Sequence, residues 1–189
     1  KAMQNFEANK PKDASENLIR CFNEGIENFI LGNFYFKRDF NTGRLYHSGS
    51  NLSRLARPFI LIDGEETAEI DTGCSQPSYA TTLYPGDCAE RRKYIGLISD
   101  NIYATLEELA CMEYESYKKL KGKFFEEVFY CKNGNVWEKP LWNVYKEILP
   151  LHAALITKEK LDDYKQFSNL MQTREADLMV GKVVQRLRE

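Results

Sequence analysis

The stretch RPFILIDGEETAEIDTGCSQP, residues 57–77, has the pattern of a β-hairpin that ends in a carboxylate. Residues 59–62 predict a short buried strand, the pair 63–64 (Asp-Gly) is a turn signal, and the chain returns over residues 67–70. Asp71 follows the returning strand directly, where a side chain is held in a fixed place at a strand end. The function of the chain therefore depends on what Asp71 binds.

The rest of the chain is mostly helical by period. Apolar residues recur at helical spacing before and after the hairpin, and Ser15 and Gly32 are the expected cap and stop of the first helix. The last helix is expected to have a break near Thr173, and residues 33–57 are expected to be irregular. The expected fold class is α+β: a small antiparallel sheet around residues 58–71 and a predominantly helical remainder. The predicted helical ranges are 15–31, 88–132, 138–149 and 158–189.

The 189-residue chain has an ordinary globular composition, with 43% apolar and 29% charged residues. Its formal net charge of −2 provides no global positive field, so a nucleic-acid site would have to be a local patch. The five cysteines form no C-x-x-C pair, which argues against a zinc site or a disulfide framework and favours a cytoplasmic location. We expect no membrane partner, because no apolar run is long enough to span a bilayer.

One interpretation of Asp71 is an aspartic protease. The segment FILIDGEETAEIDTGCS, residues 59–75, resembles the strand–loop–strand approach to Asp-Thr-Gly in retroviral-type proteases, which pair two carboxylates across a dimer. A second apolar-apolar-Gly element is then expected, and LMVGK at residues 178–182 is a nominal match inside a helical stretch. The long helical pattern after Asp71 does not fit an almost all-β protease, so this is the alternative interpretation.

Five segments in order resemble family-A (polymerase I-like) DNA polymerases, over about residues 40–189. The resemblance implies a divergent, phage- or mobile-element-like palm-and-fingers portion. It divides the chain into an N-terminal helical segment (1–37), a palm-like strand segment with Asp71 (38–87), a fingers-like helical region (88–157) and a long helix returning to the palm (158–189). The five segments are TGRLYHSGSNL (42–52), EIDTGCSQP (69–77), SDNIYATLEELA (99–110), YKKLKGKFFEEVFYCKN (117–133) and LMQTREADLM (170–179).

The resemblance implies template-directed addition of nucleotides to a 3′ hydroxyl, assisted by two Mg²⁺ ions. The expected partners are a nucleic-acid primer–template and nucleoside triphosphates. Asp71 would be catalytic and would bind the metal, and Lys121 would be catalytic and would face the triphosphate. Phe125, Phe129 and Gln76 would also contact the nucleotide. The residues expected to bind the primer–template are Arg44, Arg54, Arg57 and Gln172.

The chain departs from the family pattern at several positions. Tyr117 stands where an arginine is expected, and Phe129 stands where a tyrosine is typical. Gln76 replaces a glutamate that helps to exclude the ribose 2′-oxygen, so the choice between DNA and RNA stays open. The second metal-binding carboxylate would follow Gln172, beyond Glu189, so we expect a fragment that is inactive in isolation.

A third interpretation is a polymerase-like domain that binds nucleic acid or protein without turnover. Without the resemblance, Phe125 and Phe129 are more readily explained as core residues, and Lys121 as part of a solvated basic face.

Overall fold

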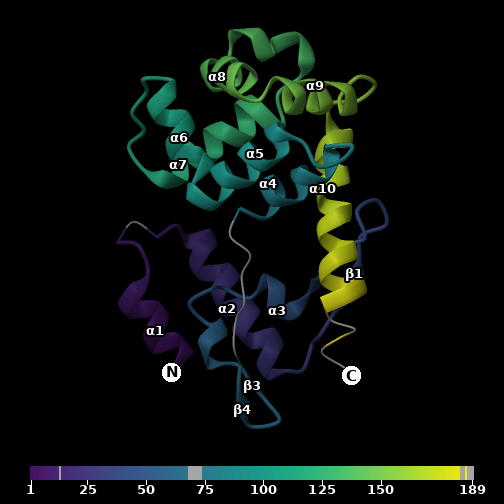
Figure 1. The fold of residues 1–189 in the computed structure, drawn as a ribbon. Helices are drawn as coiled ribbons and strands as arrows, with labels where there is room; N and C mark the ends of the chain where they lie inside the picture. Colours follow the sequence, from purple (N-terminus) through teal and green to yellow (C-terminus); the bar gives the residue numbers. More distant parts are fainter. Residues whose placement is uncertain (13, 68–73, 184–185, 187–189) are drawn as a thin grey trace. The chain divides into compact units, whose positions relative to one another are not determined.

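Helices make up most of the chain, and the strands of the described residues form two short antiparallel hairpins, so the fold class is α+β as predicted (Figure 1). The computed structural model describes residues 1–12, 14–67, 74–183 and 186. The chain divides into two compact units, Lys1–Thr72 and Gly73–Glu189, each of which is described by itself. The boundary falls inside the predicted segment 38–87, and the functional roles of the predicted segments stay predictions.

The first unit is built on helix α2 (Glu16–Ile30), which the sequence predicted correctly at both ends. The Ser15 hydroxyl oxygen accepts a hydrogen bond from the Leu18 amide at 3.2 Å, which satisfies one of the free N–H groups of the first turn. After the helix, Gly32 adopts φ +69°, a left-handed conformation that favours glycine and ends the helix.

A small core holds the first unit together. Phe22 of α2 stacks on Phe6 of α1 (Ala2–Asn9), with ring centroids 3.9 Å apart. Leu52 and Ala56 complete the group of buried side chains. This core is small because many apolar side chains of the unit are exposed.

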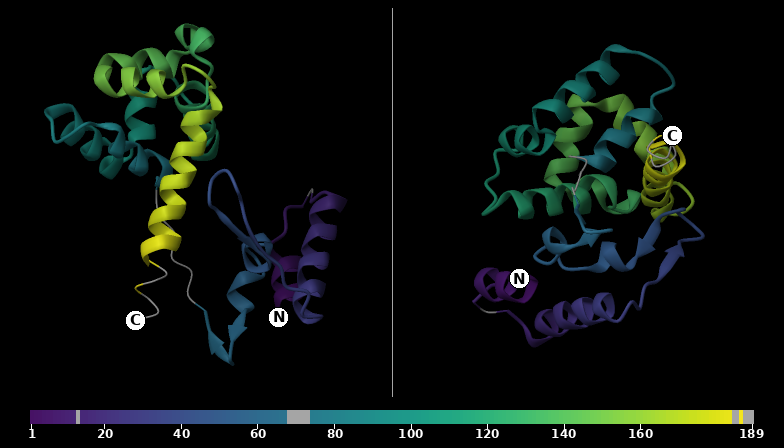
Figure 2. Two further views of the ribbon diagram at one scale, coloured as in Figure 1. Left: turned by 90° about the vertical axis from the view of Figure 1, so that its right-hand side faces the viewer. Right: turned by 90° about the horizontal axis from the view of Figure 1, so that it is seen from below.

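The hairpin of β1 (Phe36–Arg38) and β2 (Leu45–His47) lies in the region that the sequence analysis expected to be irregular. Its strands pair antiparallel with Phe36 opposite His47, and the short helix α3 (Ser48–Asn51) follows. In Figure 2 it is the long loop that projects from the helices of its own unit. The sequence does not reveal it because both strands are largely exposed and lack an apolar–polar alternation.

The second hairpin, β3 (Leu61–Ile62) and β4 (Glu65–Glu66), confirms the predicted Asp-Gly turn. Asp63 and Gly64 both have positive φ, 53° and 85°, as a type I′ turn requires. The strands themselves differ from the prediction. The returning strand is β4, and Thr67 lies after it outside any strand; the predicted residues 68–70 lie outside the described residues.

The predicted strand over residues 59–62 was also wrong in two respects. Residues Arg57–Phe59 form the 3-10 helix η1, because Pro58 sits at the start of a helical turn. Leu61 is 57% exposed, so the strand is not buried within its unit.

The second unit is a bundle of helices (Figure 1). Its buried side chains form one core that is rich in aromatic residues. The predicted helical stretches 88–132 and 138–149 are confirmed, with interruptions at Asn101 and over residues 110–116. The first six elements are α4 (Ser75–Ala80), η2 (Thr81–Leu83), α5 (Ala89–Asp100), α6 (Ile102–Leu109), α7 (Tyr117–Phe124) and the π-helix η3 (Phe125–Phe129). They are followed by η4 (Asn133–Glu138), α8 (Pro140–Ile148), α9 (Pro150–Glu159), α10 (Lys165–Leu178) and η5 (Met179–Val183).

Two carboxylates from other helices cap α8 and α9, each of which begins with a proline. Glu90 accepts hydrogen bonds from the amides of Leu151 (3.0 Å) and His152 (2.7 Å) at the start of α9. Glu127, which is buried, accepts from the Leu141 amide at 3.1 Å at the start of α8. A negative charge at a helix N-terminus is favourable, so these acids fix the helices in place.

The C-terminal helices differ from the predicted single helix over residues 158–189. Lys158 belongs to α9, the chain turns at residues 160–164, and Thr173 lies in the middle of α10 without a break. Asp163 accepts a hydrogen bond from the Lys165 amide at 2.9 Å, which starts the new helix. Within the part of the chain that the structure describes, no helix is long and apolar enough to cross a membrane.

Candidate functional site

The predicted site residues fall in both units. Asp71, the predicted metal ligand, lies outside the described residues, in the stretch 68–73. Gln76, Lys121, Phe125, Phe129 and Gln172 lie in the second unit, and the three arginines lie in the first. The site is therefore built here from helices α4, α7 and α10 of the second unit.

Gln76 lies on α4, the short helix that follows residues 68–73, which are outside the described residues. Its side-chain oxygen accepts a hydrogen bond from the Tyr130 hydroxyl, which lies 54 residues further along the chain. The buried Tyr94 hydroxyl of α5 donates to the Pro77 carbonyl at 2.9 Å and holds the same helix from the other side. These two bonds fix Gln76 beside the end of the α7–η3 helix.

Lys121 lies on the exposed side of α7. The Ser116 hydroxyl oxygen caps this helix by accepting from the Lys119 amide at 3.4 Å, and Leu120 and Phe124 bury its inner face. Lys121 follows Leu120 by about 100° around the helix, which directs it away from that inner face. An exposed Lys121 is compatible with the prediction that its ammonium group faces a bound triphosphate.

The helix changes from α to π at Phe125, which the sequence did not predict. The Tyr130 amide donates to the Phe125 carbonyl at 2.7 Å, the i to i+5 bond of a π-helix. Single π turns are rare in proteins, and where they occur they are often at functional sites. Phe125 is half-buried, and its ring stacks on that of Tyr130 with centroids 5.4 Å apart and planes 19° apart.

Phe129 lies in the core. It is 0% exposed, and its ring meets Phe124 at 4.8 Å and Phe167 at 5.0 Å between centroids. In this structure the ring has no free face for a base, so the predicted base contact by Phe129 needs correction. The extra residue of the π turn rotates the chain after Phe125, so Phe125 and Phe129 no longer have equivalent environments.

Lys160 holds the end of the π-helix, and the sequence analysis missed it. Lys160 is 3% exposed, and its ammonium group donates to the carbonyls of Val128 (2.9 Å) and Cys131 (3.2 Å). Burial lowers the pKa of Lys160 to about 8. The sequence around Lys160 does not indicate that it is buried, because the carbonyls that it binds belong to Val128 and Cys131, about 30 residues earlier in the chain.

Gln172 lies on α10, which packs against α4. Its side-chain nitrogen donates to the Ser168 hydroxyl at 3.1 Å within the same helix. Phe167 and Met171 are fully buried and anchor the helix, whereas Gln172 is half-buried. The segments predicted to carry Gln76 and Gln172 are therefore neighbours in the fold.

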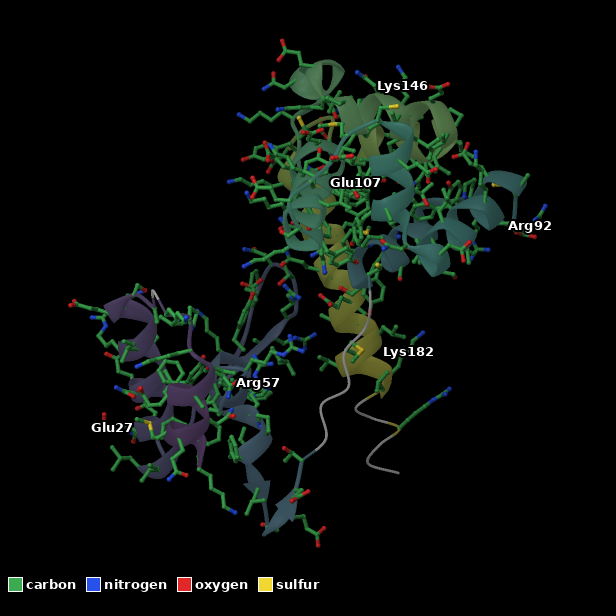
Figure 3. All side chains as sticks on the ribbon, turned by 90° about the vertical axis from the view of Figure 1, so that its left-hand side faces the viewer. Glu27, Arg57, Arg92, Glu107, Lys146 and Lys182 are labelled. Atoms are coloured by element: carbon green, nitrogen blue, oxygen red, sulfur yellow. The ribbon has the colours of Figure 1, made fainter. Side chains whose placement is uncertain are left out.

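The three predicted primer–template arginines have different environments in the first unit. Arg57, labelled in Figure 3, begins η1, and its Nε donates to the Leu52 carbonyl at 3.0 Å. Arg44 is half-buried and lies just before β2, where its carbonyl accepts from the Asp39 amide at 2.8 Å. Arg54 is exposed between α3 and η1.

A buried polar cluster in the second unit has a structural explanation. His152 is fully buried, hydrogen-bonds to the Tyr145 hydroxyl and lies 3.0 Å from the Ala80 carbonyl through Nε2. Burial lowers the pKa of His152 to about 4. Both ring nitrogens of His152 have partners in the protein.

Among residues 1–12, 14–67, 74–183 and 186, no three His, Cys, Asp or Glu side chains are grouped as metal ligands. The predicted ligand Asp71 is not among these residues. Comparison of the chain with protein-family models, with curated protein sequences and with solved structures gives no match.

Proposed function

We propose that this chain is part of a template-directed nucleotidyltransferase and that its second unit binds a nucleoside triphosphate. The observation that carries the proposal is the Tyr130–Gln76 hydrogen bond, which joins two segments that were predicted separately as nucleotide-binding. On α7, Lys121 precedes by one turn the half-buried ring of Phe125, which stacks on the same Tyr130. The Lys121 ammonium, the Phe125 ring and the Gln76 amide therefore lie on α7, η3 and α4.

Each of these groups has a chemical role in the proposal. The Lys121 ammonium would bind phosphate oxygens and offset their charge. The Phe125 and Tyr130 rings would lie beside the base or sugar, because aromatic faces stack on bases of any sequence. The oxygen of Gln76 is occupied by Tyr130, so its NH₂ group is the part available to a sugar hydroxyl or a phosphate.

Mg²⁺ stays a prediction that depends on Asp71. When bound, the ion would neutralise phosphate charge and align the reacting oxygens. Its predicted ligand, Asp71, lies outside the described residues. Arg44, Arg54 and Arg57 stay predicted contacts to the primer–template backbone.

The test is the binding of a fluorescent nucleoside triphosphate to the full chain, with variants of two lysines on α7. Lys121→Ala is expected to raise the dissociation constant about 5- to 30-fold, the effect of losing a bond worth ~1–2 kcal/mol. The matched control is Lys119→Ala, because Lys119 lies on the other side of the helix, where it pairs with the exposed Glu115. Equal affinities of the two variants, or no binding by the unmodified chain, would refute the proposed site.

A further inference from the structure

The β1–β2 hairpin, residues 36–47 with its tip, combines exposed rings with positive charge. Phe40 at the tip is 100% exposed and Phe36 is 71% exposed. Lys37 and Arg38 are exposed beside them, and Arg44 follows on the returning side. A protein normally buries large apolar rings, so two exposed phenylalanines beside three cations need an explanation.

The strand register places a ring and a cation on each face of the hairpin. Phe36 is paired with His47, and their rings stack with centroids 6.2 Å apart and planes 20° apart. Side chains alternate between the faces, so Arg38 lies on the face of Phe36. On the opposite face Lys37 is paired with Tyr46.

The only acidic residue of the hairpin is used inside its tip. The Asp39 carboxylate accepts hydrogen bonds from the Asn41 amide (3.0 Å), the Thr42 amide (2.7 Å) and the Thr42 hydroxyl (2.8 Å). The bond from the Thr42 hydroxyl contributes most to lowering the pKa of Asp39. Gly43 has φ +69°, which closes the turn. The tip is therefore held by its own bonds, and Phe40 is presented on a defined support.

The base of the hairpin forms one wall of an open groove of about 1720 Å³ in the first unit. This volume exceeds the roughly 300–1,000 Å³ of a small-molecule site, so the groove suits an extended ligand. Its walls carry further aromatic side chains, the cations Lys1 and Arg57, and the carboxylates of Asp63 and Glu66. The aromatic lining residues are Phe29, Phe34, Tyr35, Phe36 and Phe59.

We propose that the β1–β2 hairpin and the adjoining groove bind single-stranded nucleic acid, with the exposed rings stacking on bases and the cations contacting phosphates. Planar rings interleaved with positive charge match a polyanion that carries planar groups. A membrane surface is typically bound by an amphipathic helix with a broad apolar face, whereas this element is a β-hairpin with cations on both faces. The inference concerns the first unit and holds without the triphosphate site proposed for the second.

The test is fluorescence anisotropy of a labelled 20-nucleotide oligothymidine with the full chain, at low salt and without Mg²⁺ or nucleoside triphosphate. Phe36→Ala and Phe40→Ala are each expected to weaken binding about 5- to 100-fold, as for loss of a stacked base. Phe40→Leu keeps an apolar side chain without a flat ring and should stay as weak as Phe40→Ala. The matched control is Leu31→Ala, which changes a 63% exposed apolar residue of the same unit outside the groove.

The cations are tested by salt dependence. Removing Lys37 and Arg38 together should reduce the slope of log K against log salt by about 1.4, roughly 0.7 for each phosphate contact on a single strand. Absence of oligonucleotide binding would overturn the inference, and so would unchanged binding by Phe40→Leu. Binding to phosphatidylserine vesicles in place of the oligonucleotide would also overturn it. Failure of triphosphate binding would overturn only the site in the second unit.

Discussion

Lys160 offers the sharpest test of the second unit, because its ammonium group is buried yet charged at neutral pH. Lys160 is 3% exposed, and its ammonium group donates to two carbonyls at the end of the π-helix and lies 5.6 Å from the centre of the Trp142 ring. Burial lowers its pKa to about 8 from the ordinary 10.5. The neighbouring Cys131 has the smaller, opposite influence on this pKa.

The direction of the effect follows from proton linkage. Between the two pKa values the unfolded chain holds the proton more tightly than the folded chain, so stability rises with pH. The free-energy cost of burying the charged Lys160 ammonium group is fully present below about pH 8. It disappears as the pH rises toward 10.5. Lowering the pKa of Lys160 from 10.5 to about 8 corresponds to roughly 3 kcal/mol of stability, of which about 2 kcal/mol is recovered between pH 7 and pH 9.5.

The assay is urea unfolding followed by tryptophan fluorescence, which reports on the second unit because Trp137 and Trp142 are the only tryptophans. The free energy of unfolding of the unmodified chain should rise by about 2 kcal/mol relative to Lys160→Met between pH 7 and pH 9.5. The comparison with Lys160→Met cancels the titration of the buried tyrosines, and Cys131→Ala controls for the neighbouring thiol. Parallel pH curves for the two proteins would refute the buried, charged state of Lys160.

Three further predictions concern a helix cap, a half-buried carboxylate and a buried histidine. Ser15→Ala should lower the free energy of unfolding of the first unit by about 1 kcal/mol by removing the α2 cap, as measured by circular dichroism in urea, with Ser15→Asn retaining it. Glu90→Ala should cost about 2–3 kcal/mol in the tryptophan assay, because the Tyr84 hydroxyl and two backbone amides lose their acceptor; a loss below 1 kcal/mol would contradict this role. Burial lowers the pKa of His152 to about 4, so stability should fall by about 3 kcal/mol from pH 6.5 to pH 4, and His152→Phe should remove most of this fall.

Local signals in the sequence predicted the elements that depend on local chemistry. Ser15 and Gly32 bound α2, and Asp63-Gly64 forms its turn because these residues favour those backbone conformations. The strands of the second hairpin were misplaced because Pro58 favours a helical turn. The β1–β2 hairpin was missed because its stability depends on the tip bonds of Asp39, which leave no periodic pattern.

The arrangement around Gln76 was predictable only in part. The order of the segments predicted that Gln76 and Lys121 belong to one site, but the Tyr130 hydrogen bond and the π turn at Phe125 depend on packing. The same packing makes Phe129 a core residue. The burial of Lys160 could not be predicted, because the neighbouring residues in the sequence do not distinguish a buried lysine from an exposed one.

The most direct test of the proposed function is a titration of the full chain with a fluorescent nucleoside triphosphate, with Mg²⁺ and with a chelator. We expect binding that requires Mg²⁺ and that weakens about tenfold or more in Asp71→Asn, which loses the charge of the predicted ligand. Equal affinity with the chelator, or an Asp71→Asn variant that binds as tightly as the unmodified chain, would contradict the account.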